Sequence, residues 1–296
     1  MKVKSVIIAC LLFAASAQVK AQSYRDFAHV KQLSKSAPYD NAGHQSFPDF
    51  TYQSQLSPQL IGLRQAFNLD SVAGKGSQTD RAIRLLNWFH NQVPHQDTLN
   101  IDSLNAMNVI SFYRSHKVGQ GCYVLSIGMN DIFLAMGFKS RTVICFSDAY
   151  PVAHGGHVVN ALYIDSLNKW IYIDPQENAY MKDEKGLFLS IEEVRQRIID
   201  GRPIILNSTA NYHNIPTKKE DYVYTFLAEH LYRMICPVVS EYNSQTITPG
   251  KVFTYVELLP VGSKDPKADR FETSVSKRYS VITYHTNNSN LFWKKP

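Results

Sequence analysis

The sequence lacks several patterns that would point directly to a function. It has no run of five charges of one sign, so nothing in it indicates nucleic-acid binding. It has no internal repeat and no low-complexity linker. Its short glycine loop, residues 118–122, lacks the G-x-G-x-x-G spacing and the preceding strand of a phosphate or dinucleotide loop. These absences leave a globular domain or a pair of small ones.

Metal-ligand spacings are also missing. No Cys-x-x-Cys pair occurs. His154 and His157 stand three residues apart, but no carboxylate cluster or further histidine lies nearby to complete a tetrahedral set. We therefore expect no metal site and no cofactor, and we interpret His154 as a loop residue near a cleft.

Long hydrophobic runs are absent except near the start, where residues 6–15 are apolar but too few to span a bilayer. Lys2 and Lys4 precede this run, and Val19-Lys20-Ala21 resembles a cleavage site, so residues 1–21 are predicted to be a secretory signal peptide. The residues up to Cys10 resemble a lipobox, which would anchor the chain to a lipid through Cys10. The apolar run continues past this residue, which favours a signal peptide without lipid attachment. We expect an exported protein, periplasmic, cell-surface or extracellular, with no transmembrane span.

Removal of this leader would leave three cysteines, Cys122, Cys145 and Cys236. An odd number in an exported chain argues against a disulfide framework and leaves at least one free thiol. The formal charge of +6 would fall by three, because the leader holds Lys2, Lys4 and Lys20 and no acidic residue.

Cys122 is predicted to open a helix. Gly119 and Gly121 disfavour a helix before it, and Gly137 provides a left-handed stop after it. At a helix start, the free N–H groups and the dipole favour a thiolate and lower the pKa from about 8.5. The apolar residues of this helix share one face: Leu125, Met129, Ile132 and Met136.

Three strands are predicted after this helix. Residues 141–146 are rich in β-formers, and residues 157–164 and 170–174 alternate in polarity. The polar segment 165–168 is the expected hairpin turn. Pro175 ends the last strand because it has no N–H for the ladder.

The register of this hairpin decides whether His157 and Asp174 can meet. With a four-residue loop, Ile164 pairs with Lys169 and Asp174 falls opposite Val159, on the same face as His157. The two residues would then be diagonal neighbours about 7 Å apart between α-carbons. A loop of odd length would separate them.

A cysteine that opens a helix, a histidine that starts one strand and an aspartate that ends the next follow one another in this order. This arrangement resembles the transglutaminase-like superfamily of papain-fold cysteine enzymes, and the sequence resembles a secreted bacterial-type member of it. The matching motifs are the glycine-cysteine helix start, then "AMGFKSRTV", "HVVNALYI" and "KWIYIDP", over about 60 residues. The resemblance implies that Cys122 is the nucleophile, His157 the base and Asp174 the residue that orients it. The match departs from the family at Val158 and Val159, where an aromatic residue is common.

Each of these residues also has an ordinary structural interpretation. A lone cysteine is more often a small buried hydrophobe, and we expect this of Cys145 and Cys236. His157 alone could be a core histidine, and Asp174 alone an Asp-Pro turn. The combination of the three carries the prediction. The candidates for the remaining site functions are Gln120 and His116 as oxyanion donors, and His154 and Trp170 as cleft residues.

The rest of the chain is predicted to support this core. After the signal peptide, residues 22–56 form a polar, loosely held arm, residues 57–205 the catalytic core, and residues 206–296 a C-terminal helix and strands packed on it. The expected helices begin at Ser57-Pro58, at Ser77 with a capping box, near Asp102, and over 191–200 and 220–234; the expected later strands are 252–259 and 279–284, joined by 262–270. His90 and His95 are interpreted as surface or packing histidines, and Phe292-Trp293 as docked on the body.

The fold predicted is α+β, papain-like or transglutaminase-like, with helices before a mainly antiparallel sheet. The predicted function is acyl transfer through cysteine, most simply hydrolysis of a peptide, protein or cell-wall peptide. Two alternatives stay open: an amine acyltransferase of the transglutaminase type, and a binding module for a surface polymer or protein that keeps the fold.

Overall fold

The computed structural model describes residues 24–42, 46–99, 101–150, 155–263 and 271–296. The predicted signal peptide with Cys10, and the predicted cleft residue His154, lie outside the described residues.

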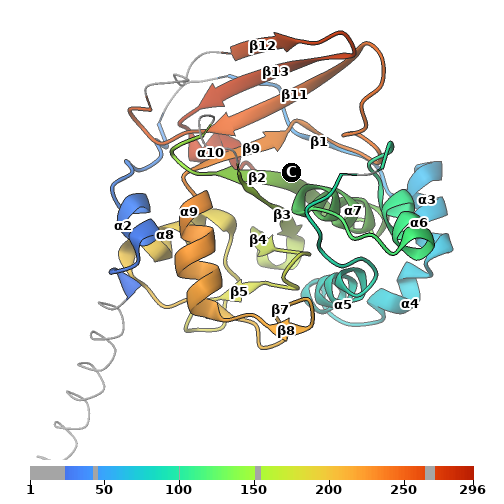
Figure 1. The fold of residues 1–296 in the computed structure, drawn as a ribbon, viewed down its shortest axis with the longest axis horizontal. Helices are drawn as coiled ribbons and strands as arrows, with labels where there is room; N and C mark the ends of the chain where they lie inside the picture. The colour runs from blue at the N-terminus through green and yellow to red at the C-terminus, as the bar shows by residue number, and fades with distance from the viewer. Residues whose placement is uncertain (1–23, 43–45, 100, 151–154, 264–270) are drawn as a thin grey trace, which may run out of the picture.

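Helices occupy the first half of the chain and return after residue 190 (Figure 1). They are α2 (Ala28–Leu33), α3 (Pro58–Ala66), α4 (Leu69–Ala73), α5 (Gln78–His90), α6 (Ala106–His116), α7 (Cys122–Ala135), α8 (Ile191–Asp200), α9 (Ala228–His230) and α10 (Ser289–Phe292), with a 3₁₀ turn η1 (Asp165–Leu167) and a π-helix η2 (Glu220–Leu227).

All strands but β1 follow α7, and they build one large sheet with short satellite pairs. They are β1 (Thr51–Tyr52), β2 (Lys139–Phe146), β3 (His157–Ile164), β4 (Lys169–Ile173), β5 (Met181–Lys182), β6 (Ile205–Leu206), β7 (Asn211–Tyr212), β8 (Ile215–Pro216), β9 (Arg233–Pro237), β10 (Val239–Ser240), β11 (Lys251–Leu258), β12 (Phe271–Val275) and β13 (Tyr279–Thr286).

The large sheet has the strand order β12-β13-β11-β9-β2-β3-β4. All of its neighbours pair antiparallel except β11 and β13, which run parallel. Helices precede the sheet in the chain, so the predicted α+β class with a mainly antiparallel sheet is confirmed. The sheet also joins the two predicted chain segments on either side of residue 205, because β9 pairs with β2.

Two hydrophobic cores cover the two faces of strands β2 to β4. Residues Val159, Ala161 and Tyr163 of β3 enter one core with α8 and η2, whereas Leu162 and Ile164 enter the other with α3 to α7. Figure 1 shows these helix groups on opposite sides of the strands. Every residue of β3 is buried, as expected for a strand that is covered on both faces.

Helix ends agree with the capping signals in the sequence. Ser57 is the N-cap of α3 with Pro58 at the first position, and Ser77 and Ser190 form capping boxes with Asp80 and Glu193. The side chains of Ser77 and Ser190 accept from the helix backbone, and a cap of this kind typically contributes about 1 kcal/mol to helix stability. The helix predicted near Asp102 begins at Ala106 instead.

The predicted helix over 220–234 is wrong in its last four residues, 231–234. It consists of η2 and α9 and ends at His230, and Met234 and Cys236 belong to strand β9. The helical spacing of apolar residues continues past the end of the helix at His230. Pairing in the sheet outweighs this local pattern, because β9 lies between β2 and β11 and pairs with both.

Two further predictions need correction. Residues 22–56 were expected to be a loosely held arm, but within them Val30 and Leu33 of α2 are buried in the main core, and β1 pairs with β10. The strands 252–259 and 279–284 were expected to be joined by a hairpin or loop, but β12 intervenes and forms the hairpin with β13. The C-terminal Phe292 is buried, as predicted.

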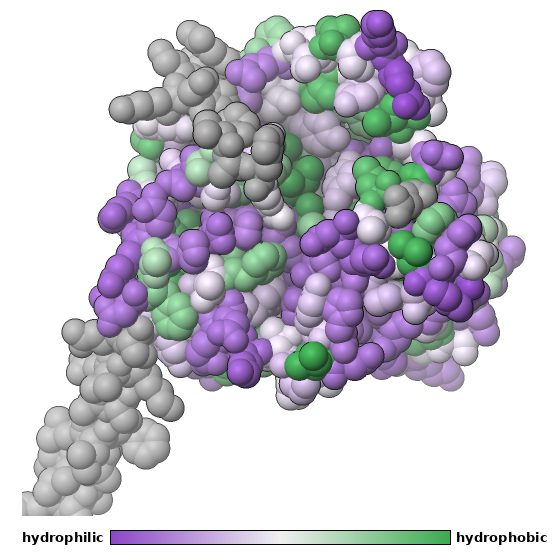
Figure 2. Space-filling view, in the orientation of Figure 1, coloured by the Kyte–Doolittle hydropathy of each residue, from purple (hydrophilic) through white to green (hydrophobic). Residues whose placement is uncertain are grey.

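Hydrophilic side chains cover much of the face shown in Figure 2, with hydrophobic residues in separate patches. No helix within the described ranges is long and apolar enough to cross a membrane.

Candidate active site

The site begins at the N-terminus of α7, where Cys122 is the first helical residue and Gly121 the N-cap. Its approach loop pairs with residues 94–98 as a short extended segment, with Gln96 N–H donating to the carbonyl of Gln120 at 3.0 Å. Gly119 is required there, because a β-carbon would stand 2.4 Å from the carbonyl oxygen of Pro94. The predicted helix start at Cys122 is confirmed.

Helix α7 is fixed against β3 by two hydrogen bonds. Ser126 Oγ donates to the carbonyl of Val158 at 2.7 Å, and Asn160 Nδ2 donates to the carbonyl of Ser126 at 2.9 Å. Cys122 lies four residues before Ser126, one helical turn on the same face. The start of α7 therefore lies level with the start of β3, where His157 stands.

The β3–β4 hairpin has the register that the sequence predicted. Ile164 pairs with Lys169, and the ladder continues to Asn160 opposite Ile173. The next residue along, Asp174, reaches His157, and the distance between His157 Nε2 and Asp174 Oδ2 is 2.6 Å. Both side chains are buried. A four-residue loop thus brings the two residues onto one face, as expected.

Asp174 uses its two carboxylate oxygens for different purposes. Oδ1 accepts from the backbone N–H of Gln176 at 2.8 Å and so shapes the turn after β4. Oδ2 accepts from His157 Nε2 and from the hydroxyl of Tyr222. Asp174 therefore holds the turn with one oxygen and contacts His157 with the other.

This bond also determines which nitrogen of His157 is free. A carboxylate only accepts, so Nε2 carries the proton that it donates to Asp174. His157 Nδ1 has no hydrogen-bond partner among the described residues. Nδ1 is therefore the nitrogen that is available to exchange a proton with a neighbouring group, and the thiol of Cys122 is such a neighbour.

The protonation preferences of the three residues favour an ion pair. Burial disfavours the Cys122 thiolate, but the neighbouring His157 and His95 rings and the charge of His157 outweigh it and lower the thiol pKa to about 6. Burial likewise disfavours the His157 imidazolium, but Asp174 outweighs it and raises the histidine pKa. Burial opposes ionisation of Asp174, whereas His157 and Tyr222 hold its carboxyl pKa below the ordinary value. The net preference is a thiolate beside an imidazolium.

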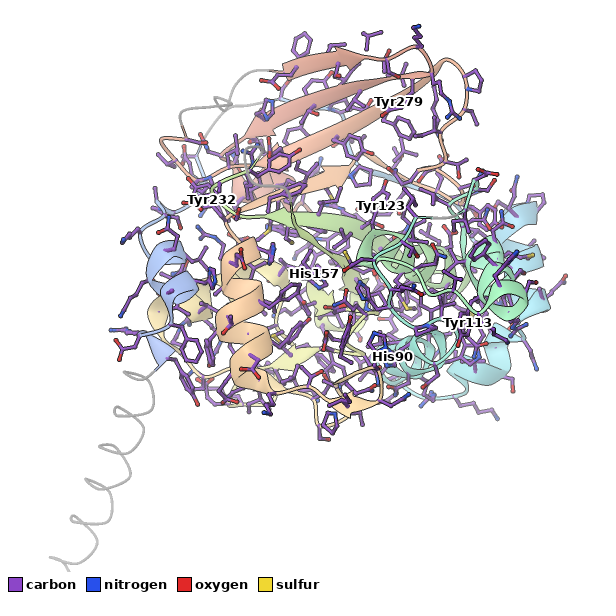
Figure 3. The ribbon with its side chains drawn as sticks, viewed as in Figure 1. His90, Tyr113, Tyr123, His157, Tyr232 and Tyr279 are labelled. Atoms are coloured by element: carbon purple, nitrogen blue, oxygen red, sulfur yellow. The ribbon has the colours of Figure 1, made fainter. Side chains whose placement is uncertain are left out.

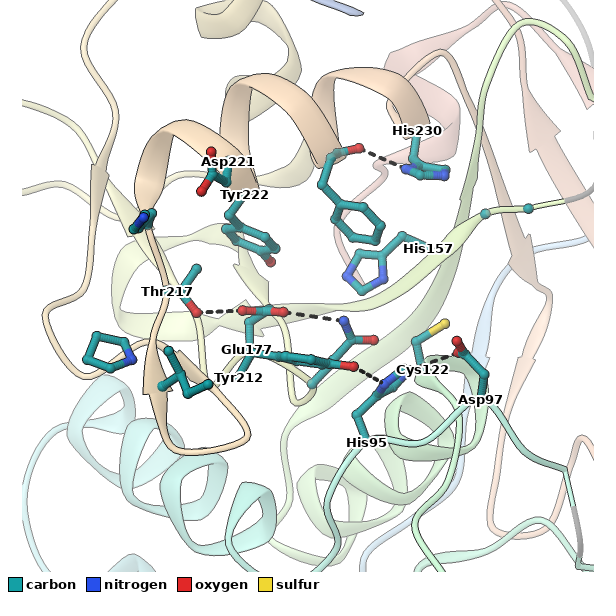
Figure 4. A pocket seen from close by; sticks show the side chains of 17 residues that line it. His95, Asp97, Cys122, His157, Glu177, Tyr212, Thr217, Asp221, Tyr222 and His230 are labelled. Carbon is teal, nitrogen blue, oxygen red and sulfur yellow. Dashed lines mark hydrogen bonds and ion pairs between the residues drawn. The ribbon is translucent and has the colours of Figure 1, made fainter.

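Cys122 and His157 line a cavity of about 770 Å³ between α7 and the segment 212–230. Figure 3 shows His157 at the centre of the molecule, and Figure 4 shows Cys122 and His157 in the wall of the cavity. The cavity wall also carries exposed residues, among them Asp97, Lys218 and Asp221, so it opens to solvent.

His95 is a cavity residue that the sequence analysis took for a packing or surface histidine. Its pairing with the loop before Cys122 places its ring close enough to lower the thiol pKa. Its Nδ1 lies 2.9 Å from the hydroxyl of Tyr212, and its Nε2 lies 3.3 Å from Asp97 (Figure 4). Nothing local in the sequence signals this placement, because it depends on a pairing across about 25 residues of chain.

The π-helix η2 supplies the wall opposite Cys122. Tyr222 reaches Asp174, and the ring of Phe226 meets the ring of His157 edge-on with 4.8 Å between centroids. The backbone carbonyl of Phe226 lies 2.8 Å from His230 Nδ1. π-Helical turns are rare and often mark functional sites. Here Tyr222 and Phe226, four residues apart, both face the Asp174–His157 pair.

Of the two predicted oxyanion donors, the structure brings only Gln120 near the nucleophile. Gln120 is fully buried two residues before Cys122, and neither polar atom of its amide has a hydrogen-bond partner among the described residues. His116 ends α6, stacks on Phe112 and borders a separate depression. Lys117 takes a left-handed conformation and turns the chain away after it. The geometry therefore does not support His116 as a donor.

The prediction that Trp170 lines the cleft is wrong. Its side chain is buried, its Nε1 donates to the carbonyl of Trp293 at 3.0 Å, and the Arg141 guanidinium lies 4.3 Å from its ring centroid. Trp170 shares the face of Asp174 but stands four residues earlier on β4, about 13 Å along the strand. It therefore stabilises the far end of the sheet.

The other two cysteines behave as expected of buried hydrophobes. Cys145 on β2 and Cys236 on β9 are buried, and no cysteine of the described residues forms a disulfide. Burial raises the thiol pKa of both, that of Cys236 to about 12. Within the described part of the chain, no three His, Cys, Asp or Glu side chains gather as a metal site.

Comparison with known proteins places this arrangement in a family. Residues 65–175, which contain Cys122, His157 and Asp174, match the model of the transglutaminase-like superfamily. This part of the chain is transglutaminase-like. The sequence resemblance is thereby confirmed, and the fold is the transglutaminase-like fold of cysteine enzymes.

Other comparisons add little to this assignment. Among solved structures, a "putative cysteine protease" from Cytophaga hutchinsonii is similar over 43% of this chain and 40% of its own, with 13% identity and a TM-score of 0.32. A search of curated proteins found no match. Tyr222 and Phe226 lie beyond the residues matched by the superfamily model, so this wall of the cavity belongs to the chain's own C-terminal part.

The position of Tyr222 gives a first testable prediction. In Tyr222→Phe, Oδ2 of Asp174 loses one of its two close donors, and we expect steady-state hydrolysis of p-nitrophenyl acetate to slow about tenfold at unchanged KM. The matched control is Tyr224→Phe in the same π-helix, whose ring stacks on that of Tyr24 with 4.3 Å between centroids and which should have a smaller effect. Equal losses in both variants, or a lowered melting temperature with full turnover, would assign Tyr222 a structural role alone.

Proposed function

We propose that the protein is an exported cysteine hydrolase that cleaves a peptide or amide bond with Cys122, His157 and Asp174 as its catalytic triad. The observation that carries the proposal is the hydrogen-bonded His157–Asp174 pair with a free Nδ1 in the same cavity as a thiol of lowered pKa. A structural cysteine has no need of this electrostatic environment, as the raised thiol pKa of Cys145 illustrates.

In the proposed mechanism the Cys122 thiolate attacks the carbonyl carbon of the substrate. The backbone N–H of Cys122, free because it is the first of a helix, and the side chain of Gln120 stabilise the developing oxyanion. His157 Nδ1–H gives its proton to the departing amine, and a thioester remains on Cys122. His157 then takes a proton from water, which attacks the thioester and releases the acid and the free thiolate. Asp174 holds the imidazole orientation throughout.

Water is the proposed acceptor because the cavity opens to solvent through exposed residues such as Lys218 and Asp221. An amine acyltransferase would need a route that keeps water from the thioester. We therefore rank transfer to an amine second. A non-catalytic binding module ranks third, because it would have no use for an activated thiol.

Alkylation by iodoacetamide tests the proposal without knowledge of the substrate. In the wild type, Cys122 should react along a curve with its midpoint near pH 6, because the thiolate forms as the pH rises through its lowered pKa. In His157→Ala, the midpoint should return toward about 8.5, and the rate at pH 6 should fall by roughly 100-fold. Mass spectrometry separates Cys122 from Cys145 and Cys236.

His116→Ala serves as the matched control, since it removes an exposed imidazole that borders another depression. This variant should retain the wild-type curve. An ordinary thiol pKa for Cys122 in the wild type would contradict the hydrolase and favour the binding module.

A further inference from the structure

A buried carboxylate lies in the cavity and has no part in the proposed triad. Glu177 follows Asp174 by three residues, lines the cavity and is only 7% exposed. Its Oε2 accepts from Thr217 Oγ1 at 2.5 Å, and its Oε1 accepts from Gln176 Nε2 at 3.3 Å (Figure 4). Both donors are neutral, so they orient the carboxylate without balancing its charge.

Glu177 has no cationic partner within the described part of the chain. None of the ion pairs formed there includes it. Burial and the charge of Asp174 raise its pKa, and the imidazolium of His157 opposes them only weakly. A buried carboxylate without a counter-ion is costly, so proteins usually pair such groups. A substrate cation in the cavity would supply the missing charge.

The backbone around Glu177 is rigidly held. Its carbonyl accepts from the N–H of Asn211 on β7 at 2.9 Å, and the N–H of Thr217 donates to the carbonyl of Ala210 at 3.0 Å. The β7–β8 hairpin thus fixes both the backbone of Glu177 and the hydroxyl that orients its side chain. A glutamine could anchor Thr217 equally well, so this anchoring does not account for the charge.

An aromatic side chain lies in the same part of the cavity. Tyr212 directly follows Asn211, whose N–H donates to the carbonyl of Glu177 at 2.9 Å, and both Tyr212 and Glu177 line the cavity. Tyr212 and Phe226 both line the cavity. A carboxylate beside aromatic rings is a favourable environment for an ammonium group, which gains both a salt bridge and a cation–π contact.

We propose that Glu177 is a specificity residue that binds an ammonium group of the substrate, so that the enzyme selects peptides or amides with a free amino group near the scissile bond. This inference rests on the proposed function, because it assigns the substrate class of the same cavity. It predicts poor use of substrates whose amine is acetylated.

Charged thiol reagents test the selection directly. The probes are methanethiosulfonates that carry an ammonium, a hydroxyl or a sulfonate on an ethyl group; the Cys122 sulfur attacks the thiosulfonate sulfur, a disulfide forms and methanesulfinate leaves. After normalisation to a small thiol, we expect the wild type to prefer the ammonium over the hydroxyl reagent about tenfold. In Glu177→Gln this preference should fall below about twofold. Asp221→Asn, a matched change at an exposed cavity residue, should retain it.

A binding measurement separates this inference from the hydrolase itself. In Cys122→Ala, NMR titration should show L-alanyl-L-alanine amide binding about tenfold more tightly than its N-acetyl form, and Glu177→Gln in that background should abolish the difference. Slow reaction of Cys122 with the hydroxyl reagent would count against the hydrolase alone. A preference that Glu177→Gln leaves unchanged, or equal or undetectable binding of the two peptides, would overturn the role of Glu177.

Discussion

Asp174→Asn should lower the steady-state hydrolysis of p-nitrophenyl acetate by about 10³-fold or more, although it changes only one atom. Oδ1 of Asp174 accepts from the backbone N–H of Gln176, so the amide oxygen of the variant should occupy that place. The amide nitrogen then takes the place of Oδ2 and faces His157 Nε2. Because an amide nitrogen only donates, Nε2 must become an acceptor.

The consequence is a proton on the wrong nitrogen of His157. The neutral imidazole would carry its proton on Nδ1, where the mechanism needs a base that can take a proton from water. An equivalent change in serine-protease triads costs about 10⁴-fold in kcat for the same reason. The imidazolium also loses its carboxylate partner, so the pKa of His157 should fall and that of the Cys122 thiol should rise. Iodoacetamide alkylation should therefore shift to higher pH.

NMR of the ring nitrogens distinguishes this cause from misfolding. The wild type should show protonated Nε2 over a wide pH range, and Asp174→Asn a neutral ring protonated at Nδ1. Asp221→Asn provides the control for a carboxylate lost elsewhere in the cavity and should retain at least half of the activity. Near-normal turnover in Asp174→Asn would mean that His157 does not depend on Asp174 and would remove Asp174 from the triad.

The predictable part of this site is the part that local sequence determines. The start of α7 follows from glycines before an apolar helical face, and the meeting of His157 with Asp174 follows from one hairpin of even loop length. In both cases the decisive residues lie within 20 positions of each other. The order of the motifs, which resembles that of the superfamily, then linked Cys122 to this pair.

The rest of the site depends on contacts that no local pattern reports. His95 reaches the nucleophile through a short extended pairing, and Tyr222 reaches Asp174 from 48 residues away. The periodicity over 220–234 predicted a helix but did not reveal its π-helical turn, which has no simple sequence signal. The prediction that Trp170 lines the cleft failed because strand alternation gives the face on which a side chain lies but not its neighbours across the sheet.

Glu257→Leu should destabilise the protein by about 3–5 kcal/mol, measured as the free energy of unfolding in urea. Glu257 on β11 is 1% exposed, accepts from Arg233 Nε at 2.5 Å, and lies 2.8 Å from His285 Nδ1. Leucine removes the only carboxylate that pairs with the buried Arg233 among the described residues. A buried guanidinium without a partner is strongly destabilising.

The double variant Glu257→Leu/Arg233→Met is the decisive comparison. It removes both charges and should be more stable than Glu257→Leu alone, because no buried charge is left unpaired. Glu272→Gln, which alters an exposed carboxylate 3.9 Å from His285, should change the stability by less than about 0.5 kcal/mol. A loss below about 1 kcal/mol in Glu257→Leu would mean that Arg233 finds other partners.

The buried cluster of Glu257, Arg233 and His285 also supports strand β2, which pairs with β3 beside the site. Arg233 Nη1 donates to the carbonyl of Tyr150 at 3.3 Å, and the ring of Tyr150 stacks on Phe146 at the end of β2 with 3.9 Å between centroids. His157, the first residue of β3, pairs with Cys145, the neighbour of Phe146. Glu257→Leu should therefore slow the alkylation of Cys122 by more than the unfolded fraction explains. If Arg233 alone carries this effect, Arg233→Met should reproduce it.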